Sequence, residues 1–206
     1  AAAARDSAGV VAIHLPAQLS GIYDAAVLAS RLVHGAPLRV LNSHSVSMAQ
    51  GFVVLEAARA AATGASLNAV EARAREMRDK VHFLAILDTL EYLHRGGRIG
   101  GAAALLGTAL QIKPVLFVNE GLDEPLASPR TKRKAIRLIL ERIAGQVGGR
   151  PVHVAVLHAA ELSEAEELQR LLAREFVCLE SFLGEFTPVM GAHTGPGQLG
   201  VAYYAD

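Results

Sequence analysis

The sequence contains a single cysteine, Cys178, so it cannot form an internal disulfide. It also lacks a long hydrophobic run. Although 51% of its 206 residues are hydrophobic, charged residues, His or Gly interrupt every apolar stretch well before the ~18 residues that a membrane helix needs. Twenty basic and twenty acidic residues cancel, so no net charge would attract nucleic acid or an anionic membrane. These features argue against transmembrane and nucleic-acid-binding functions, and they predict a protein of the reducing cytoplasm.

Motifs for metal ions and nucleotides are absent as well. The histidines are dispersed, and no Cys or His pair has the spacing of a zinc site. Gly96-Gly97 and Gly100-Gly101 do not form the dinucleotide fingerprint, and no glycine-rich loop ends in Gly-Lys-Ser or Gly-Lys-Thr. We therefore expect no metal, no cofactor and no direct binding of ATP.

The first part of the chain alternates strand and helix patterns. The apolar run Val10 to Leu15 has the length and composition of a strand buried on both faces of a parallel sheet. Helical and strand-like segments follow, and His82 to Leu87 has the pattern of a further strand. This alternation predicts an α/β domain with a doubly wound parallel sheet over residues 1–88. Because residues 1–6 are typical of a helix end that runs straight into the first strand, we expect this domain to be incomplete at its N-terminus.

The second part of the chain has a different texture, which predicts a second, α+β domain over residues 89–206. Asn119-Glu120-Gly121 between two apolar runs indicates a hairpin, and Pro125 places the second of these strands at a sheet edge. The remaining expected elements are helices over 102–110, 131–147 and 163–175, a strand over 151–158, an extended stretch over 177–189, a Gly/Pro-rich loop over 191–200 and a last strand over 201–204.

The segment from Leu90 to Ile99 says most about function. Its helical start is expected to be capped by Asp88, and Gly96-Gly97 end the helix because glycine adopts the positive φ that a helix end requires. Arg98 is therefore expected on a sharp, defined corner.

Ser20 lies where the first strand gives way to a helix, a place where α/β sheets commonly bind ligands and where free N–H groups attract an anion. The simpler interpretation, which position alone favours, is that its hydroxyl caps the helix. The two roles are compatible, because a hydroxyl can donate to a carboxylate while the N–H groups of the first helical turn point the same way.

His193 lies in a segment with three glycines and a proline, Met190 to Gly197. Such a segment predicts a tight loop that exposes the imidazole and the Thr194 hydroxyl. An incidental histidine in a turn is an equally good interpretation. A catalytic role would require a nucleophile and an orienting acid, and no Gly-Xaa-Ser-Xaa-Gly elbow is present.

Four basic residues, Arg130, Lys132, Arg133 and Lys134, surround the start of the helix predicted over 131–147. Positive charge at a helix N-terminus opposes the helix dipole. An anion or an acidic partner would offset that cost, but a solvated basic face is the favoured interpretation for most of the four.

Several ordered motifs together resemble the DegV family over essentially the whole chain. They are Ile13-His14-Leu15, Leu19-Ser20-Gly21-Ile22-Tyr23, the region from Ser43 to Gly51, Asp88-Thr89-Leu90-Glu91-Tyr92-Leu93, Gly96-Gly97-Arg98-Ile99, Ile112-Lys113-Pro114, Arg130-Thr131-Lys132 and Gly191 to Gly200. The resemblance implies two domains with one long-chain fatty acid enclosed between them. The family's N-terminal strands, with a loop that supplies another hydroxyl to the carboxylate, have no counterpart in this sequence.

The same resemblance implies roles for individual residues. Ser20 and His193 would bind the carboxyl or acyl-phosphate head group, with Gly21 and Thr194 close by. Arg98 and Arg130 would lie at the head-group end and meet a partner kinase. Such a protein resembles the acyl-carrying subunit of the bacterial fatty acid kinase system of phospholipid metabolism, which leaves ATP to a separate subunit.

Our leading hypothesis is therefore a fatty-acid-binding carrier in which no residue is catalytic. The alternative is an enzyme of acyl or phosphoryl transfer in which His193 acts as general base.

Overall fold

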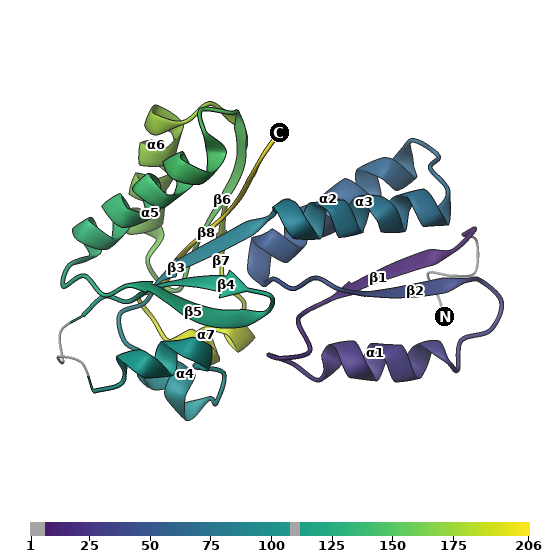
Figure 1. Ribbon diagram of the computed structural model, residues 1–206, viewed down its shortest axis with the longest axis horizontal. Coiled ribbons are helices and arrows are strands. Elements are labelled where there is room, and N and C mark those ends of the chain that lie inside the picture. The colour runs from purple at the N-terminus through teal and green to yellow at the C-terminus, as the bar shows by residue number, and fades with distance from the viewer. Residues whose placement is uncertain (1–6, 108–111) are drawn as a thin grey trace. The chain divides into compact units, whose positions relative to one another are not determined.

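The computed structural model describes residues 7–107 and 112–206, which form parts of two compact units, Ala1–Val81 and His82–Asp206 (Figure 1). The helix end expected at residues 1–6 and the last part of the helix expected over 102–110 lie outside the described residues. The division falls earlier than the join expected near residue 88, because the strand after Val81 pairs with strands of the second unit. Over the described ranges, no helix is both long and apolar enough to cross a bilayer.

The first unit is built on two parallel strands, β1 (Val10–His14) and β2 (Leu38–Asn42), which pair in register from Val10 with Leu38 to His14 with Asn42. Helix α1 (Ile22–Ser30) lies on one side of this pair, and α2 (Ser47–Ala62) and α3 (Leu67–Lys80) lie on the other (Figure 1). The expected strand and helix order is confirmed here. Helix α3 begins after Ser66, whose hydroxyl accepts a hydrogen bond from the Ala69 N–H.

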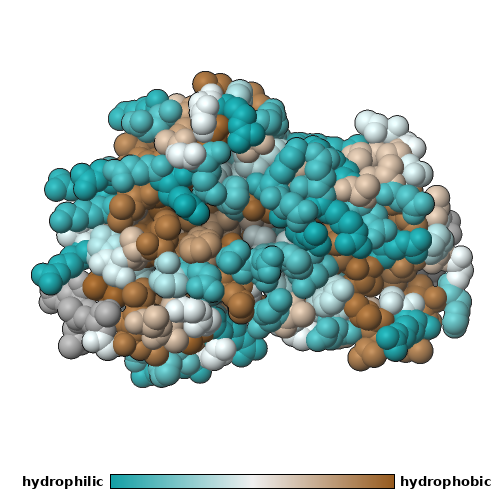
Figure 2. Space-filling model, in the orientation of Figure 1, coloured by the Kyte–Doolittle hydropathy of each residue, from teal (hydrophilic) through white to brown (hydrophobic). Residues whose placement is uncertain are grey.

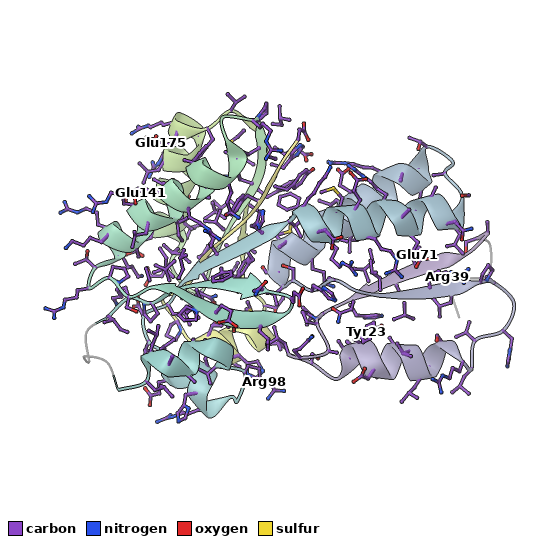
Figure 3. The ribbon with its side chains drawn as sticks, viewed as in Figure 1. Tyr23, Arg39, Glu71, Arg98, Glu141 and Glu175 are labelled. Atoms are coloured by element: carbon purple, nitrogen blue, oxygen red, sulfur yellow. The ribbon has the colours of Figure 1, made fainter. Side chains whose placement is uncertain are left out.

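Charged side chains join the outer elements of this unit. Arg39 Nε on β2 lies 3.3 Å from Glu71 Oε2 on α3, and the two side chains point toward one another (Figure 3). Arg73 of α3 pairs with Glu56 of α2. Burial alone would raise the pKa of Glu56, but hydrogen bonds from Arg73 and Arg59 outweigh it and lower that pKa. Charged residues of α3 therefore stabilise the α2–α3 pair.

The second unit is a six-stranded sheet with the strand order β5-β4-β3-β8-β6-β7. Only β6 and β7 pair in parallel, and the other neighbours are antiparallel. The elements in chain order are β3 (His82–Ile86), α4 (Glu91–Arg95), the 3-10 helix η2 (Gly100–Leu105), β4 (Val115–Asn119), β5 (Leu122–Ala127), α5 (Lys132–Val147), β6 (Val152–His158), α6 (Leu162–Glu175), β7 (Cys178–Glu185), α7 (Pro188–Thr194) and β8 (Leu199–Ala205). The mixed α/β class expected from the sequence is confirmed.

The core of this unit lies between the sheet and the helices α5 and α6, which occupy one side of it (Figure 1). Alternate strand positions such as Val154 and Val156 face these helices, as a period of two requires. The helices present residues at intervals of three and four, namely Ala135, Ile139, Ile143 and Val147 from α5 and Ala165, Leu168 and Leu172 from α6.

The hairpin predicted at Asn119-Glu120-Gly121 is confirmed as β4–β5, with Asn119 paired to Leu122. Glu120 and Gly121 both have positive φ, 48° and 86°, as a two-residue hairpin turn of type I′ requires. Pro125 lies on β5, an edge strand of the sheet, where a missing N–H costs least.

Asp123 of this hairpin gives a pH-dependent prediction. Burial, with a smaller contribution from Glu124, raises the pKa of Asp123 from 3.8 to about 6. The folded protein therefore favours the neutral carboxyl, so its stabilising contribution is complete below pH ~4 and is lost as pH rises through about 6. We expect Asp123→Asn to raise the free energy of unfolding at pH 7 by about 1–3 kcal/mol and to change little at pH 4.

Thermal melts of both proteins between pH 4 and 8 measure this effect. The exposed carboxylate variant Glu166→Gln on α6 is the matched control. A constant difference in melting temperature between wild type and Asp123→Asn across this range would refute the assignment.

Candidate functional site

The two motifs singled out in the sequence meet in the second unit, where α4 and α7 lie side by side (Figure 1). Three glycines allow this approach. A Cβ atom added at Gly96 would lie 2.7 Å from His193 Nδ1, and one at Gly195 would lie 2.3 Å from the Tyr92 ring. One at Gly197 would lie 2.5 Å from Asp88 Oδ2. The glycines therefore let the end of α7 and the turn after it pack directly on the segment around α4.

The α4 segment ends as the sequence predicts but begins differently. Gly97 has φ +65°, and the Arg98 N–H donates to the Leu93 carbonyl, which closes the helix end. The prediction that Asp88 caps α4 is wrong. The Thr89 hydroxyl accepts the hydrogen bond from the Glu91 N–H instead, because the Asp88 carboxylate is engaged by Lys113, whose Nζ lies 2.9 Å from Asp88 Oδ1.

Arg98 lies exposed on the corner after Gly97 (Figure 3). Its Nη1 donates to the Gly96 carbonyl at 2.8 Å. His193 of α7 lies against the same glycine, because a Cβ atom added at Gly96 would approach its Nδ1. The side chains of Arg98 and His193 therefore both lie close to Gly96.

His193 and Thr194 lie at the end of a short helix and not in a loop. Thr187 caps α7 and Pro188 occupies its first turn, so the loop predicted over 191–200 is wrong for residues 191–194. His193 is half-buried. Thr194, expected to be exposed, is buried, and its hydroxyl donates to the Met190 carbonyl at 2.9 Å.

Ser20 and Gly21 belong to the first unit. Gly21 occupies the N-cap position of α1, and the Ser20 hydroxyl accepts from the Ile22 N–H at 3.3 Å. The expectation that Ser20 is the N-cap residue is therefore off by one position. Its hydroxyl proton is not used in that bond and is suited to donation to a carboxylate.

An apolar surface begins beside Ser20. Ile22 is 50% exposed and Leu28 is 61% exposed, and α1 has no fully buried residue. Figure 2 shows hydrophobic residues gathered over this helix. A polar donor at the start of an exposed apolar helix face matches the two parts of an amphipathic ligand.

The basic start of α5 separates into paired and exposed charges. Lys132 Nζ lies 2.7 Å from Glu164 Oε2 and is largely buried, whereas Arg130, Arg133 and Lys134 are exposed. The solvated interpretation thus fits the exposed three, and Lys132 has acidic partners within the fold.

The described residues also bear on metal binding and on catalysis by the cysteine thiol. Within them, no three His, Cys, Asp or Glu side chains converge as a metal site would require. Burial raises the pKa of the Cys178 thiol, which keeps it protonated and unsuited to nucleophilic attack.

Sequence reasoning identified both segments of this site but not their contact. It assigned no role to Tyr92, whose ring lies against Gly195, and it treated Asp88 only as a cap. The sequence does contain glycines in the segments around α4 and α7. Glycines permit close packing, but they do not show which segments pack together.

Comparisons with family models, related sequences and solved structures all point to one family. A family model described as "Uncharacterised protein, DegV family" matches residues 1–206. A DegV domain-containing protein of Streptomyces coelicolor is 43% identical over 194 residues, which cover 94% of this chain and 69% of the relative. Protein DegV of Bacillus subtilis is 32% identical over 196 residues, covering 94% of this chain and 70% of that protein.

Two solved structures are similar as well. A DegV family protein from Thermus thermophilus, described in terms of its fatty acid binding, has a TM-score of 0.92 and 33% identity, covering 98% of this chain and 72% of that one. DegV of Bacillus subtilis, described as a fatty acid binding protein, has a TM-score of 0.85 and 31% identity, covering 96% of this chain and 71% of that one.

Proposed function

Because the chain belongs to the DegV family, we propose that it binds a long-chain fatty acid and presents the carboxylate to a separate kinase for acyl-phosphate formation. The observation that carries the proposal is its likeness to the fatty-acid-binding structure from Thermus thermophilus across nearly the whole chain. The carrier itself needs neither an ATP site nor a catalytic residue, and a cytoplasmic location belongs to the same proposal.

The head group is assigned to Ser20 and His193. Each offers a hydrogen-bond donor that a carboxylate requires, from the Ser20 hydroxyl and from an imidazole N–H. Gly21 contributes backbone at the start of α1. Thr194 takes part through its hydroxyl only after that group turns away from the Met190 carbonyl.

Titration of delipidated protein with sodium oleate in a calorimeter tests the proposal. We expect saturable binding of one oleate per chain, without turnover of acyl esters or acyl phosphates. The alternative, in which His193 is a general base, requires such turnover and its loss in His193→Ala. If the protein does not bind oleate, the proposal that it is a fatty-acid carrier is wrong.

The two arginines give a prediction about the kinase. Exposed charges at the rim of an interface affect association more than folding. Arg98→Ala and Arg130→Ala should therefore leave oleate affinity and melting temperature almost unchanged, while acyl-phosphate production with the cognate kinase falls steeply. Charge reversal to Glu should reduce production further, because repulsion replaces attraction.

Reconstitution with purified kinase and ATP measures this effect. Arg174→Ala, an exposed arginine on α6, is the control and should keep full activity. Full activity in both the Arg98 and Arg130 variants would exclude them from kinase docking.

A further inference from the structure

A cluster of charged side chains lies at one end of the second unit's sheet. Ile86 at the end of β3 is in register with Val115 at the start of β4 and with Leu199 at the start of β8, and Leu199 is in register with His158 at the end of β6. The loops and helix starts that follow or precede these residues therefore converge. They carry Asp88, Lys113, Lys132, Glu161 and Glu164.

Lys132 is the centre of this cluster. Its Nζ lies 2.7 Å from Glu164 Oε2, 3.5 Å from Asp88 Oδ1 and 4.0 Å from Glu161 Oε1, and its side chain is only 17% exposed. Burial alone would lower the pKa of Lys132, but the hydrogen bond to Glu164 and the neighbouring carboxylates outweigh it and raise that pKa. Lys132 therefore keeps its charge and links the segment after β3 to the starts of α5 and α6.

Asp88 connects the cluster to the turn after His193. One oxygen, Oδ1, faces the two lysines, and the other, Oδ2, lies against the backbone of Gly197, where an added Cβ would approach to 2.5 Å. The turn is also held from its other side. The Gly197 N–H donates to the Ala159 carbonyl, and the Ala159 N–H donates to the Gln198 carbonyl.

The turn from Gly195 to Gln198 is thus held by contacts with Tyr92, Asp88 and Ala159. It begins two residues after His193, so we infer that a shift of this turn moves the imidazole relative to Gly96. A displacement of about 1 Å is enough to weaken a directed hydrogen bond severely.

We propose that Asp88 and Lys132 are positioning residues, which fix the turn after α7 and thereby hold His193 at the place where it binds the ligand head group. The inference rests on the proposed function only for the identity of the ligand. Neither residue contacts the carboxylate in this scheme. Lys132, together with the nearer Lys113, orients Asp88, and Asp88 supports Gly197.

Lys132→Met and Asp88→Asn test this proposal, because each removes charge while keeping most of the side-chain volume. We expect the dissociation constant for oleate to rise at least tenfold in both. Lys132→Arg, which keeps the charge, should recover a substantial part of the affinity. Lys134→Met, an exposed lysine in the same helical turn, is the matched control and should bind oleate as the wild type does.

A second readout separates positioning from simple stabilisation. NMR spectra of the His193 ring without ligand should show changed chemical shifts in Lys132→Met and Asp88→Asn, but not in Lys134→Met. A substitution that only removes an ion pair would lower the melting temperature and leave the His193 signals unchanged. If Lys132→Met does not fold, Asp88→Asn and Lys132→Arg decide.

The outcomes are distinct. Oleate affinity within twofold of wild type and unchanged His193 chemical shifts in Asp88→Asn would overturn the positioning role, whatever the melting temperature. If the wild type does not bind oleate, the proposed function fails, and the His193 chemical shifts still show whether the cluster sets the position of this side chain.

Discussion

Gly195→Ala is expected to lower the free energy of unfolding by about 2–4 kcal/mol. Gly195 has φ +79° and ψ 173°, a conformation that is essentially restricted to glycine. An added Cβ would also lie 2.3 Å from the ring of Tyr92. Movement of the ring alone cannot relieve this clash at low energetic cost. Chemical denaturation, followed by circular dichroism, measures the loss.

Gly191→Ala, within the helix that Gly195 ends, provides the matched control. A Cβ at Gly191 meets nothing within 4 Å, and alanine is a better helix former than glycine, so this variant should be neutral or slightly stabilised. Tyr92→Ala added to Gly195→Ala should recover the steric part of the loss and leave the backbone part. A Gly195→Ala protein as stable as the wild type would show that α4 and α7 do not pack as described.

Ser20→Ala is expected to weaken fatty-acid binding by roughly 1.5–3 kcal/mol, a factor of about ten to a hundred in the dissociation constant. The reason is the loss of one hydrogen bond to a charged carboxylate. Folding should change less, because the hydroxyl makes a single long bond, to the Ile22 N–H at 3.3 Å. Calorimetric titration with sodium oleate measures the effect.

Ser30→Ala removes a hydroxyl from the other end of α1, where it donates to the Val27 carbonyl, and serves as the control. It should bind oleate with wild-type affinity. Equal affinities for wild type and Ser20→Ala would leave Ser20 with a role in α1 alone.

Local signals in the sequence identified most elements correctly. Helix α5 follows from its period of apolar residues, and the β4–β5 hairpin follows from Asn119-Glu120-Gly121. Such features depend on a few neighbouring residues, so the sequence contains the information directly. The short helix α7 also had a local signal, Thr187 followed by Pro188, which the glycines and the second proline of that region obscured.

Features set by distant residues were not predictable in the same way. The sequence indicates Asp88 as the cap of α4, but the lysines that engage its carboxylate lie far along the chain: Lys113 precedes β4 and Lys132 begins α5. The strand β3 has an apolar pattern that fits either unit, and only its pairing with β4 and β8 assigns it to the second. The roles of Ser20, Gly21, His193, Thr194, Arg98 and Arg130 in ligand or partner binding remain predictions.

Native mass spectrometry of the protein, purified without detergent from bacterial cells, shows whether it carries a fatty acid. We expect a complex heavier than the chain by the mass of one long-chain fatty acid, which organic extraction removes and added oleate restores. The complex should be depleted in Ser20→Ala and retained in Ser30→Ala. A protein that carries no lipid and takes up no oleate after extraction would not be a fatty-acid carrier.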